Sequence, residues 1–138
     1  ISRMTLVVDG SLAEAERLEK NLYKLINVIE VAHLDEKQSL QRDLALIKVS
    51  TDAEARREVA QLCDIFRARI IDVSKGSMII ELTGDERKIE NFASLLRPIG
   101  IVEMVRTGVV VMGRGEHTLT HDAYTPQRAL AGGRKSVL

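Results

Sequence analysis

The sequence predicts an α+β protein in which helices pack on one face of an antiparallel sheet. Residues 43–107 alternate between strand and helix patterns in the order β-α-β-β-α-β. The two central strands of this order are separated only by Lys75-Gly76, a spacing typical of an antiparallel hairpin. Residues 1–33 repeat the second half of the same pattern. Because two β-α-β units joined by a hairpin form the ferredoxin-like arrangement, we expect that fold.

The first third of the chain reads as a strand, a helix and a second strand. Residues 2–8 (SRMTLVV) are apolar and β-branched and end at Asp9-Gly10, a turn signal. Ser11 can cap a helix whose apolar positions recur at helical spacing, namely Leu18, Leu22 and Leu25. Residues 28–33 (VIEVAH) alternate in polarity, which indicates a second strand.

The second segment starts after a polar stretch at residues 34–41. Residues 43–50 (DLALIKVS) predict a strand, and Asp52 can cap the helix that follows. The apolar stripe of that helix is Ala55, Val59, Leu62, Cys63 and Phe66.

The remaining elements complete the second β-α-β unit. Residues 68–74 and 77–83 predict the two strands of the hairpin. Gly84 and Asp85 precede a helix that ends at Pro98, and residues 100–107 predict the last strand. The apolar stripe of this helix is Ile89, Phe92 and Leu96.

An internal repeat relates the two segments. Residues 4–8 align with residues 78–82, Gly10 aligns with Gly84, and residues 28–31 align with residues 101–104 after one added residue. The N-terminal domain therefore lacks its own first half. A β-α-β unit of ~33 residues is too small to sustain a core. Because the chain opens with Ile, we expect the missing strands upstream in the natural protein or on another chain.

These patterns predict four regions. Residues 1–34 form the C-terminal half of a ferredoxin-like domain, residues 35–41 a linker, and residues 42–107 a complete ferredoxin-like domain. Residues 108–138 form a C-terminal tail that begins apolar and becomes rich in Gly, Arg, Thr and Ser. We expect that tail to be partly disordered.

The composition argues against several classes of function. Twenty Lys and Arg balance 20 Asp and Glu, whereas proteins that bind nucleic acids or anionic membranes carry a basic excess. Aromatic residues make up 3%, too few for a base-stacking surface. A single Cys excludes an intrachain disulfide framework and fits a reducing compartment. We expect a cytoplasmic protein with no nucleic-acid or membrane partner.

No set of residues assembles a catalytic centre. Cys63 lies on an apolar helix stripe, so we expect a buried thiol. His117 and His121 are spaced i, i+4 in a segment without helical periodicity, and His33 ends a strand. Gly113-Arg114-Gly115 lacks the following helix that a phosphate-binding loop needs. We expect no catalytic residue, no cofactor site and no metal ligand in this chain.

The predicted strand at residues 43–50 is apolar on both faces. Leu44 and Leu46 alternate with Ala45, Ile47 and Val49. Because the helices cover one face of the sheet, the other should be covered by a second sheet, a ligand or a partner chain. The residues alone therefore indicate a regulatory or assembly module.

The same segments resemble the small regulatory subunit of acetolactate synthase (acetohydroxyacid synthase). That family has an N-terminal, amino-acid-binding ACT domain followed by a second ferredoxin-like domain. The resemblance extends from Ile1 to about Glu116. It is carried by residues 2–8 and 21–31 (NLYKLINVIEV) for the ACT domain, and by residues 42–49 (RDLALIKV), 65–74 (IFRARIIDVS), 81–92 (ELTGDERKIENF) and 100–116 (GIVEMVRTGVVVMGRGE) for the rest.

The resemblance implies a regulatory role in valine, leucine and isoleucine biosynthesis. The family's small subunit activates a catalytic subunit that forms 2-acetolactate from pyruvate, and it confers feedback inhibition by branched-chain amino acids, valine foremost. Thiamine diphosphate, Mg²⁺ and FAD belong to the catalytic subunit. The resemblance also implies a homodimer, in the cytoplasm of a bacterial-type cell or in a plant plastid. The family's effector-binding elements precede residues 2–8, so no effector residue is assigned.

Two other functions remain open. The chain could be an ACT-type amino-acid sensor of another biosynthetic enzyme, or an oligomerisation module without a ligand. For contacts with a catalytic subunit, position and charge favour Arg106 and Arg114.

Overall fold

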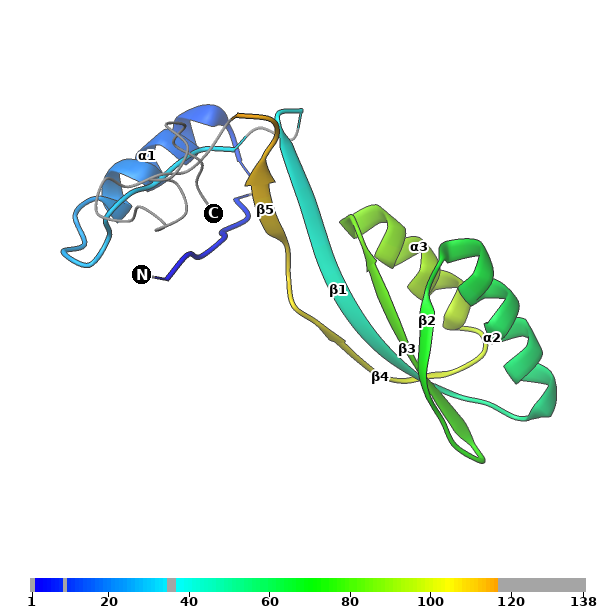
Figure 1. Ribbon diagram of the computed structural model, residues 1–138. Coiled ribbons are helices and arrows are strands. Elements are labelled where there is room, and N and C mark those ends of the chain that lie inside the picture. The colour runs from blue at the N-terminus through cyan, green and yellow to red at the C-terminus, as the bar shows by residue number, and fades with distance from the viewer. Residues whose placement is uncertain (1, 9, 35–36, 117–138) are drawn as a thin grey trace, which may run out of the picture. The chain divides into compact units, whose positions relative to one another are not determined.

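The structure is a computed structural model of the 138-residue chain, and it describes residues 2–8, 10–34 and 37–116 (Figure 1). The described residues fall into two compact units. One unit holds the described residues up to Leu40 together with those from Val111 onward, and the other is Gln41–Val110. In the described part of the chain, no helix is both long and apolar enough to cross a membrane.

The Gln41–Val110 unit has the predicted ferredoxin-like topology. Its elements are β1 (Ser39–Ser50, which starts in the other unit), α2 (Ala53–Phe66), β2 (Arg69–Val73), β3 (Ser77–Gly84), α3 (Glu86–Leu96) and β4 (Ile101–Arg106). The strand order is β2-β3-β1-β4, with every neighbouring pair antiparallel. Helices α2 and α3 lie on the same face of the sheet (Figure 1). The α+β prediction is confirmed.

Local hydrogen bonds explain where the two helices begin. The Asp52 carboxylate accepts from the backbone N–H groups of Glu54 and Ala55 at 3.0 and 2.8 Å, which lowers the pKa of Asp52. The Asp85 carboxylate accepts from the Lys88 N–H at 2.7 Å and begins α3. The predicted cap at Asp52 is confirmed, and Asp85 caps the helix that the sequence places after Gly84 and Asp85.

The core lies between the sheet and the two helices. Alternate residues of β1 and β3 face it, and they pack against the apolar stripes of α2 and α3. The most deeply buried side chains include Ile47, Val59, Ile80, Ile89 and Phe92. The predicted hairpin is also confirmed, because the Ser74 N–H donates to the Ser77 carbonyl at 2.8 Å across Lys75-Gly76.

The other unit corrects the predicted N-terminal β-α-β. Its helix α1 (Leu12–Leu22) is present, and Glu14 accepts from the Ser11 N–H at 2.7 Å, which lowers the pKa of Glu14. Residues 2–8 and 28–33 form neither strand nor helix. A strand exists only where a neighbour supplies backbone partners, and no described segment pairs with either stretch. The two predicted strands are therefore wrong for this structure.

Two predicted boundaries also move. Strand β1 starts at Ser39, so residues 39–41 of the expected linker belong to the sheet. Strand β5 (Val110–Gly113) lies in the expected tail and pairs with β1. The backbone N–H of Arg114 donates to the Gln38 carbonyl at 2.8 Å, next to the start of β1. Pairing with β5 gives the start of β1 a neighbouring strand, which the local sequence does not reveal. Residues 117–138 of the expected tail lie outside the described residues.

Candidate functional site

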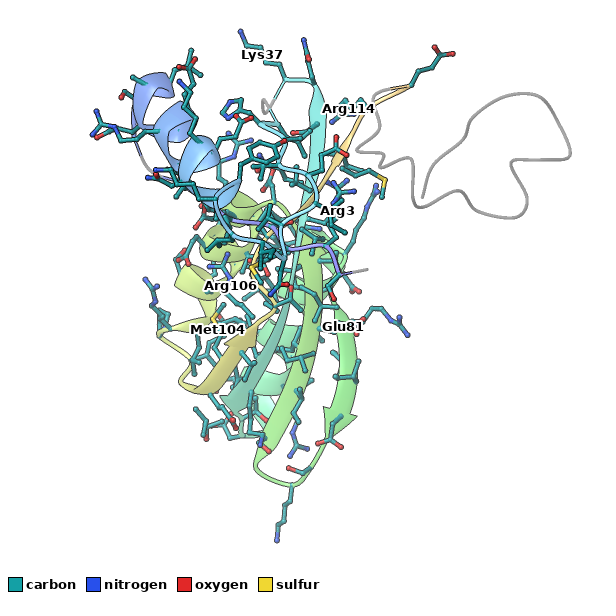
Figure 2. All side chains as sticks on the ribbon, turned by 90° about the vertical axis from the view of Figure 1, so that its left-hand side faces the viewer. Arg3, Lys37, Glu81, Met104, Arg106 and Arg114 are labelled. Carbon is teal, nitrogen blue, oxygen red and sulfur yellow. The ribbon has the colours of Figure 1, made fainter. Side chains whose placement is uncertain are left out.

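Arg106, proposed from the sequence as a partner contact, takes part in an ion-pair network at the end of β4 (labelled in Figure 2). Its Nε donates to Asp43 Oδ2 at 2.8 Å, a second guanidinium nitrogen also contacts Oδ2, and a third donates to Glu90 Oε1 at 3.1 Å. The Asp43 side chain is 0% exposed and that of Arg106 is 26% exposed. The guanidinium therefore neutralises a buried carboxylate of its own unit.

Thr107 completes this network on the other carboxylate oxygen. Its hydroxyl accepts from the Leu44 N–H at 3.1 Å and lies 3.2 Å from Asp43 Oδ1. The Thr107 N–H donates to the Leu44 carbonyl at 3.0 Å. These bonds attach the end of β4 to β1 and provide polar partners to both oxygens of the buried Asp43, as a buried carboxylate requires. The cluster therefore stabilises the pairing of β4 with β1.

Sequence reasoning missed Asp43, although the signal was present. Asp43 has the same parity as Ala45, Ile47 and Val49, which all face the core. Strict alternation along a strand therefore puts the carboxylate on the buried side. A charge at such a position needs a cationic partner from another strand, and Arg106 supplies it.

Arg114 lies in the other unit and bonds to the main chain. Its Nε donates to the Ser39 carbonyl at 2.9 Å, which holds the end of β5 against the start of β1. Arg3 also bonds to β5, because its guanidinium donates to the Val111 carbonyl at 2.8 Å. Arg106 and Arg114 thus belong to different units, and each is bonded within its own. Their role as partner contacts stays a prediction.

Several large apolar side chains are exposed in the unit that contains α1. Met4, Val7 and Ile26 are all strongly exposed. The Tyr23 hydroxyl donates to the Val31 carbonyl and accepts from the Val31 N–H, both at 3.1 Å, which connects residue 31 to the end of α1. The structure assigns no effector residue in this unit, and the sequence assigned none either.

The remaining candidates from the sequence include the Gly113-Arg114-Gly115 segment and the two histidines of the expected tail. Within residues 2–8, 10–34 and 37–116, no group of three or more His, Cys, Asp or Glu could hold a metal ion. Gly113-Arg114-Gly115 is followed by a turn at Glu116. His117 and His121 lie outside the described residues.

Cys63 is a buried thiol of α2, as predicted. Burial, with a smaller contribution from the Asp64 carboxylate, raises the pKa of the Cys63 thiol to about 11. At about pH 8 we expect native protein to react with a thiol reagent about a hundred times more slowly than denatured protein, because the thiolate is the reactive form. The absorbance change with Ellman's reagent measures both rates.

The raised pKa also sets a pH dependence of stability. The folded thiol keeps its proton to higher pH than the unfolded one, whose value is 9.0. The contribution of this group to stability is therefore complete below about pH 9 and declines as the pH approaches 11.

In the labelling experiment, equal rates for native and denatured protein would contradict the burial of Cys63.

Comparison with known proteins gives a consistent result. Residues 42–115 match the family model described as the small subunit of acetolactate synthase. A probable acetolactate synthase small subunit of Archaeoglobus fulgidus is 50% identical over 115 residues, which span 83% of this chain and 72% of that protein. The acetolactate synthase small subunit of Mycobacterium leprae is 47% identical over 115 residues, which span 83% of this chain and 68% of that protein.

A solved structure extends the similarity to the fold. The crystal structure of the acetolactate synthase small subunit from Thermotoga maritima is 42% identical, with a TM-score of 0.73. The match covers 78% of this chain and 67% of that one. The matched range 42–115 includes the elements from α2 to β5. Sequence, topology and these similarities agree, and the chain belongs to the family of acetolactate synthase small subunits.

Proposed function

We propose that this chain is the regulatory subunit of acetolactate synthase. It binds the catalytic large subunit, raises its activity and confers feedback inhibition by a branched-chain amino acid, valine foremost. The observation that carries the proposal is the family match over residues 42–115, which includes most of the ferredoxin-like unit. The relatives are small subunits of acetolactate synthase, which implies that the enzyme also has a large subunit. Acetolactate formation belongs to branched-chain amino-acid biosynthesis.

The chemistry of the reaction is assigned to the partner. Thiamine diphosphate, Mg²⁺ and FAD are held by the catalytic subunit under this proposal, and this chain supplies no catalytic residue. Arg106 and Arg114 are the proposed contacts with the catalytic subunit, in the cytoplasm or, in a plant, in the plastid.

Regulation follows from a difference in affinity between two states. The chain is proposed to act as a homodimer, with the amino-acid effector bound between ACT domains. The effector must bind one arrangement of the dimer more tightly than the other to change the activity of the partner. A 100-fold inhibition corresponds to ~2.7 kcal/mol of coupling free energy between the two sites.

The test is acetolactate formation by the matching catalytic subunit while this chain is added in increasing amounts. We expect the rate to rise and to saturate at a fixed ratio of the two subunits, since each catalytic subunit offers a limited number of binding sites. Saturating titration with unrelated protein is the control. No increase in rate, together with no co-elution of the two chains, would reject the assignment as an activating subunit.

Repeating the titration with valine separates the regulatory part of the proposal from the activating part. Loss of the added activity in valine supports feedback inhibition, and activation that is insensitive to valine rejects it while retaining activation. Amino-acid binding without any effect on acetolactate formation would favour an ACT-type sensor of another enzyme. Self-association without ligand binding or activation would favour an oligomerisation module.

A further inference from the structure

Helix α2 ends in a backbone conformation that glycine usually provides. Arg67, the residue after the helix, has a φ of 54°, in the left-handed region. Its N–H donates to the Asp64 carbonyl at 3.3 Å, and the Ala68 N–H donates to the Cys63 carbonyl at 2.8 Å. These two bonds form a Schellman motif, in which the left-handed residue is most often glycine. Among the described residues, Arg67 is the only one other than glycine with a positive φ.

The left-handed conformation is unfavourable for every residue that has a Cβ atom. The Cβ crowds the following carbonyl oxygen, and glycine avoids this contact because it lacks a Cβ. The backbone therefore gives no reason for an arginine at position 67. Any advantage of arginine over glycine at this position lies in its side chain.

The Arg67 side chain is exposed and has no partner within the described part of the chain. The carboxylate of Asp64, three residues earlier, forms no ion pair with it there. Arg106 and Arg114 differ in this respect, because Arg106 contacts the Asp43 carboxylate and Arg114 donates to a main-chain carbonyl. The Arg67 guanidinium is therefore available to bind a group outside the described chain.

An exposed apolar side chain lies two residues before this cation. Ile65, in the last turn of α2, is 73% exposed. Phe66, between the two, is half-buried and packs against the core, which anchors the end of the helix. We call Ile65 and Arg67 the α2 end patch. Arginine beside apolar side chains is typical of the centre of protein–protein interfaces.

We propose that the α2 end patch is a contact surface for the catalytic subunit. Arg67 binds a carboxylate of that partner, and Ile65 packs against an apolar side chain beside it. The inference rests on the proposed function, because it names a surface through which this chain would bind the catalytic subunit. The strained backbone at Arg67 is then retained for recognition, since strain of this kind is often found where a protein holds a ligand.

The size of the patch argues against a second copy of this chain as the occupant. A two-fold contact through the patch would bury only Ile65 and Arg67 of each copy, much less than the ~1,200 Å² that a stable specific interface needs. In a contact with the catalytic subunit, the same two side chains are one part of a larger surface.

A structural role for the Arg67 charge makes a different prediction. A cation just beyond the C-terminus of a helix interacts favourably with the helix dipole. Helix α2 has no basic residue in its last turn, so Arg67 is the first cation after that turn. If this were the purpose of Arg67, removal of the guanidinium would lower stability and binding together. Measurements of both quantities separate the two roles.

Isothermal titration calorimetry of the full chain with the matching catalytic subunit tests the inference. Arg67→Ala keeps the backbone strain but removes the guanidinium, so we expect the dissociation constant to rise about tenfold. Arg67→Gly removes both, so it should weaken binding equally while the urea midpoint stays the same or rises. Arg67→Lys keeps the charge and should lose less affinity than Arg67→Ala.

Arg57→Ala is the matched control. Arg57 is also an exposed cation of α2, but it lies inside the helix and its φ is negative. We expect this variant to bind as tightly as the wild-type chain. Ile65→Ala should weaken binding about fivefold without lowering the urea midpoint, because the side chain that it removes is mostly exposed.

The outcomes separate this inference from the proposed function. A wild-type chain that does not bind the catalytic subunit rejects the proposed function, and the inference with it. If the wild-type chain binds and Arg67→Ala binds equally well, only the inference is overturned. Equal losses for Arg67→Ala and Arg57→Ala would show a general effect of charge, and a lower urea midpoint for Arg67→Gly would show a structural role. Either result overturns the inference.

Sedimentation velocity of the wild-type chain and of Arg67→Ala completes the test. We expect the same state of association for both, because the patch is assigned to a different protein. If Arg67→Ala dissociates a wild-type dimer, the patch serves a second copy and the inference is wrong.

Discussion

Replacement of Arg106 by alanine is expected to lower the free energy of unfolding of the Gln41–Val110 unit by about 3–5 kcal/mol. The substitution leaves the fully buried Asp43 carboxylate without its cationic partner. A buried charge that has lost its counterion retains its full desolvation cost, which explains the size of the effect. Urea denaturation followed by circular dichroism measures the change.

Two further variants isolate the ion pair. Glu90→Gln is the control, because the Glu90 side chain is 50% exposed and its contact with Arg106 is expected to contribute less than about 1 kcal/mol. Asp43→Leu combined with Arg106→Met removes both charges, so it should be considerably more stable than Arg106→Ala alone. Equal stability of the double variant and Arg106→Ala would show that the loss comes from packing instead.

The same variant tests the role that the sequence suggested for Arg106. If Arg106→Ala unfolds at the wild-type urea concentration yet no longer binds the catalytic subunit, the proposed partner contact is supported and the expected contribution of the ion pair to stability is wrong. If it is destabilised, and the double variant recovers both stability and binding, the effect on the partner is indirect.

Replacement of Phe92 by alanine is expected to lower the free energy of unfolding by about 3–5 kcal/mol. Phe92 is fully buried on α3, and its ring lies 5.1 Å from that of Phe66 on α2 at an interplanar angle of 55°. The substitution opens a cavity and removes the contact between the two aromatic rings. Because small domains are stable by only about 5–15 kcal/mol, a large shift of the urea midpoint should be seen.

Leu95→Ala is the matched control on the same helix. Leu95 is partly exposed and points away from the core, so its truncation should cost much less than that of Phe92. Similar losses for the two variants would contradict the position of α3 against the sheet.

The second segment of the chain was largely predictable because its elements carry local signals. Asp52 and Asp85 cap the helices with their own side chains, and helix hydrogen bonds connect residues close in sequence. The Lys75-Gly76 link is likewise short enough to identify the hairpin. The strand order then follows from the small number of ways in which two β-α-β units joined by a hairpin can pack.

The site was less predictable because its contacts join distant residues. Arg106 was chosen by charge and position, yet its bonds run to Asp43, 63 residues away in sequence. Arg114 was chosen in the same way, and it binds the Ser39 carbonyl, 75 residues away. Alternation places Asp43 on the buried face, but nothing local identifies the residue that neutralises it.

By itself, the sequence determined the helix caps, the apolar stripes, the hairpin and the ferredoxin-like order of the second segment, together with the family resemblance. Only the tertiary structure decided which alternating segments become strands. Residues 28–33 alternate as clearly as a strand but have none of its pairing, whereas the polar residues at the start of β1 join the sheet beside β5. The physical reason is that a helix satisfies its backbone within one segment, whereas a strand depends on a partner that its own residues do not specify.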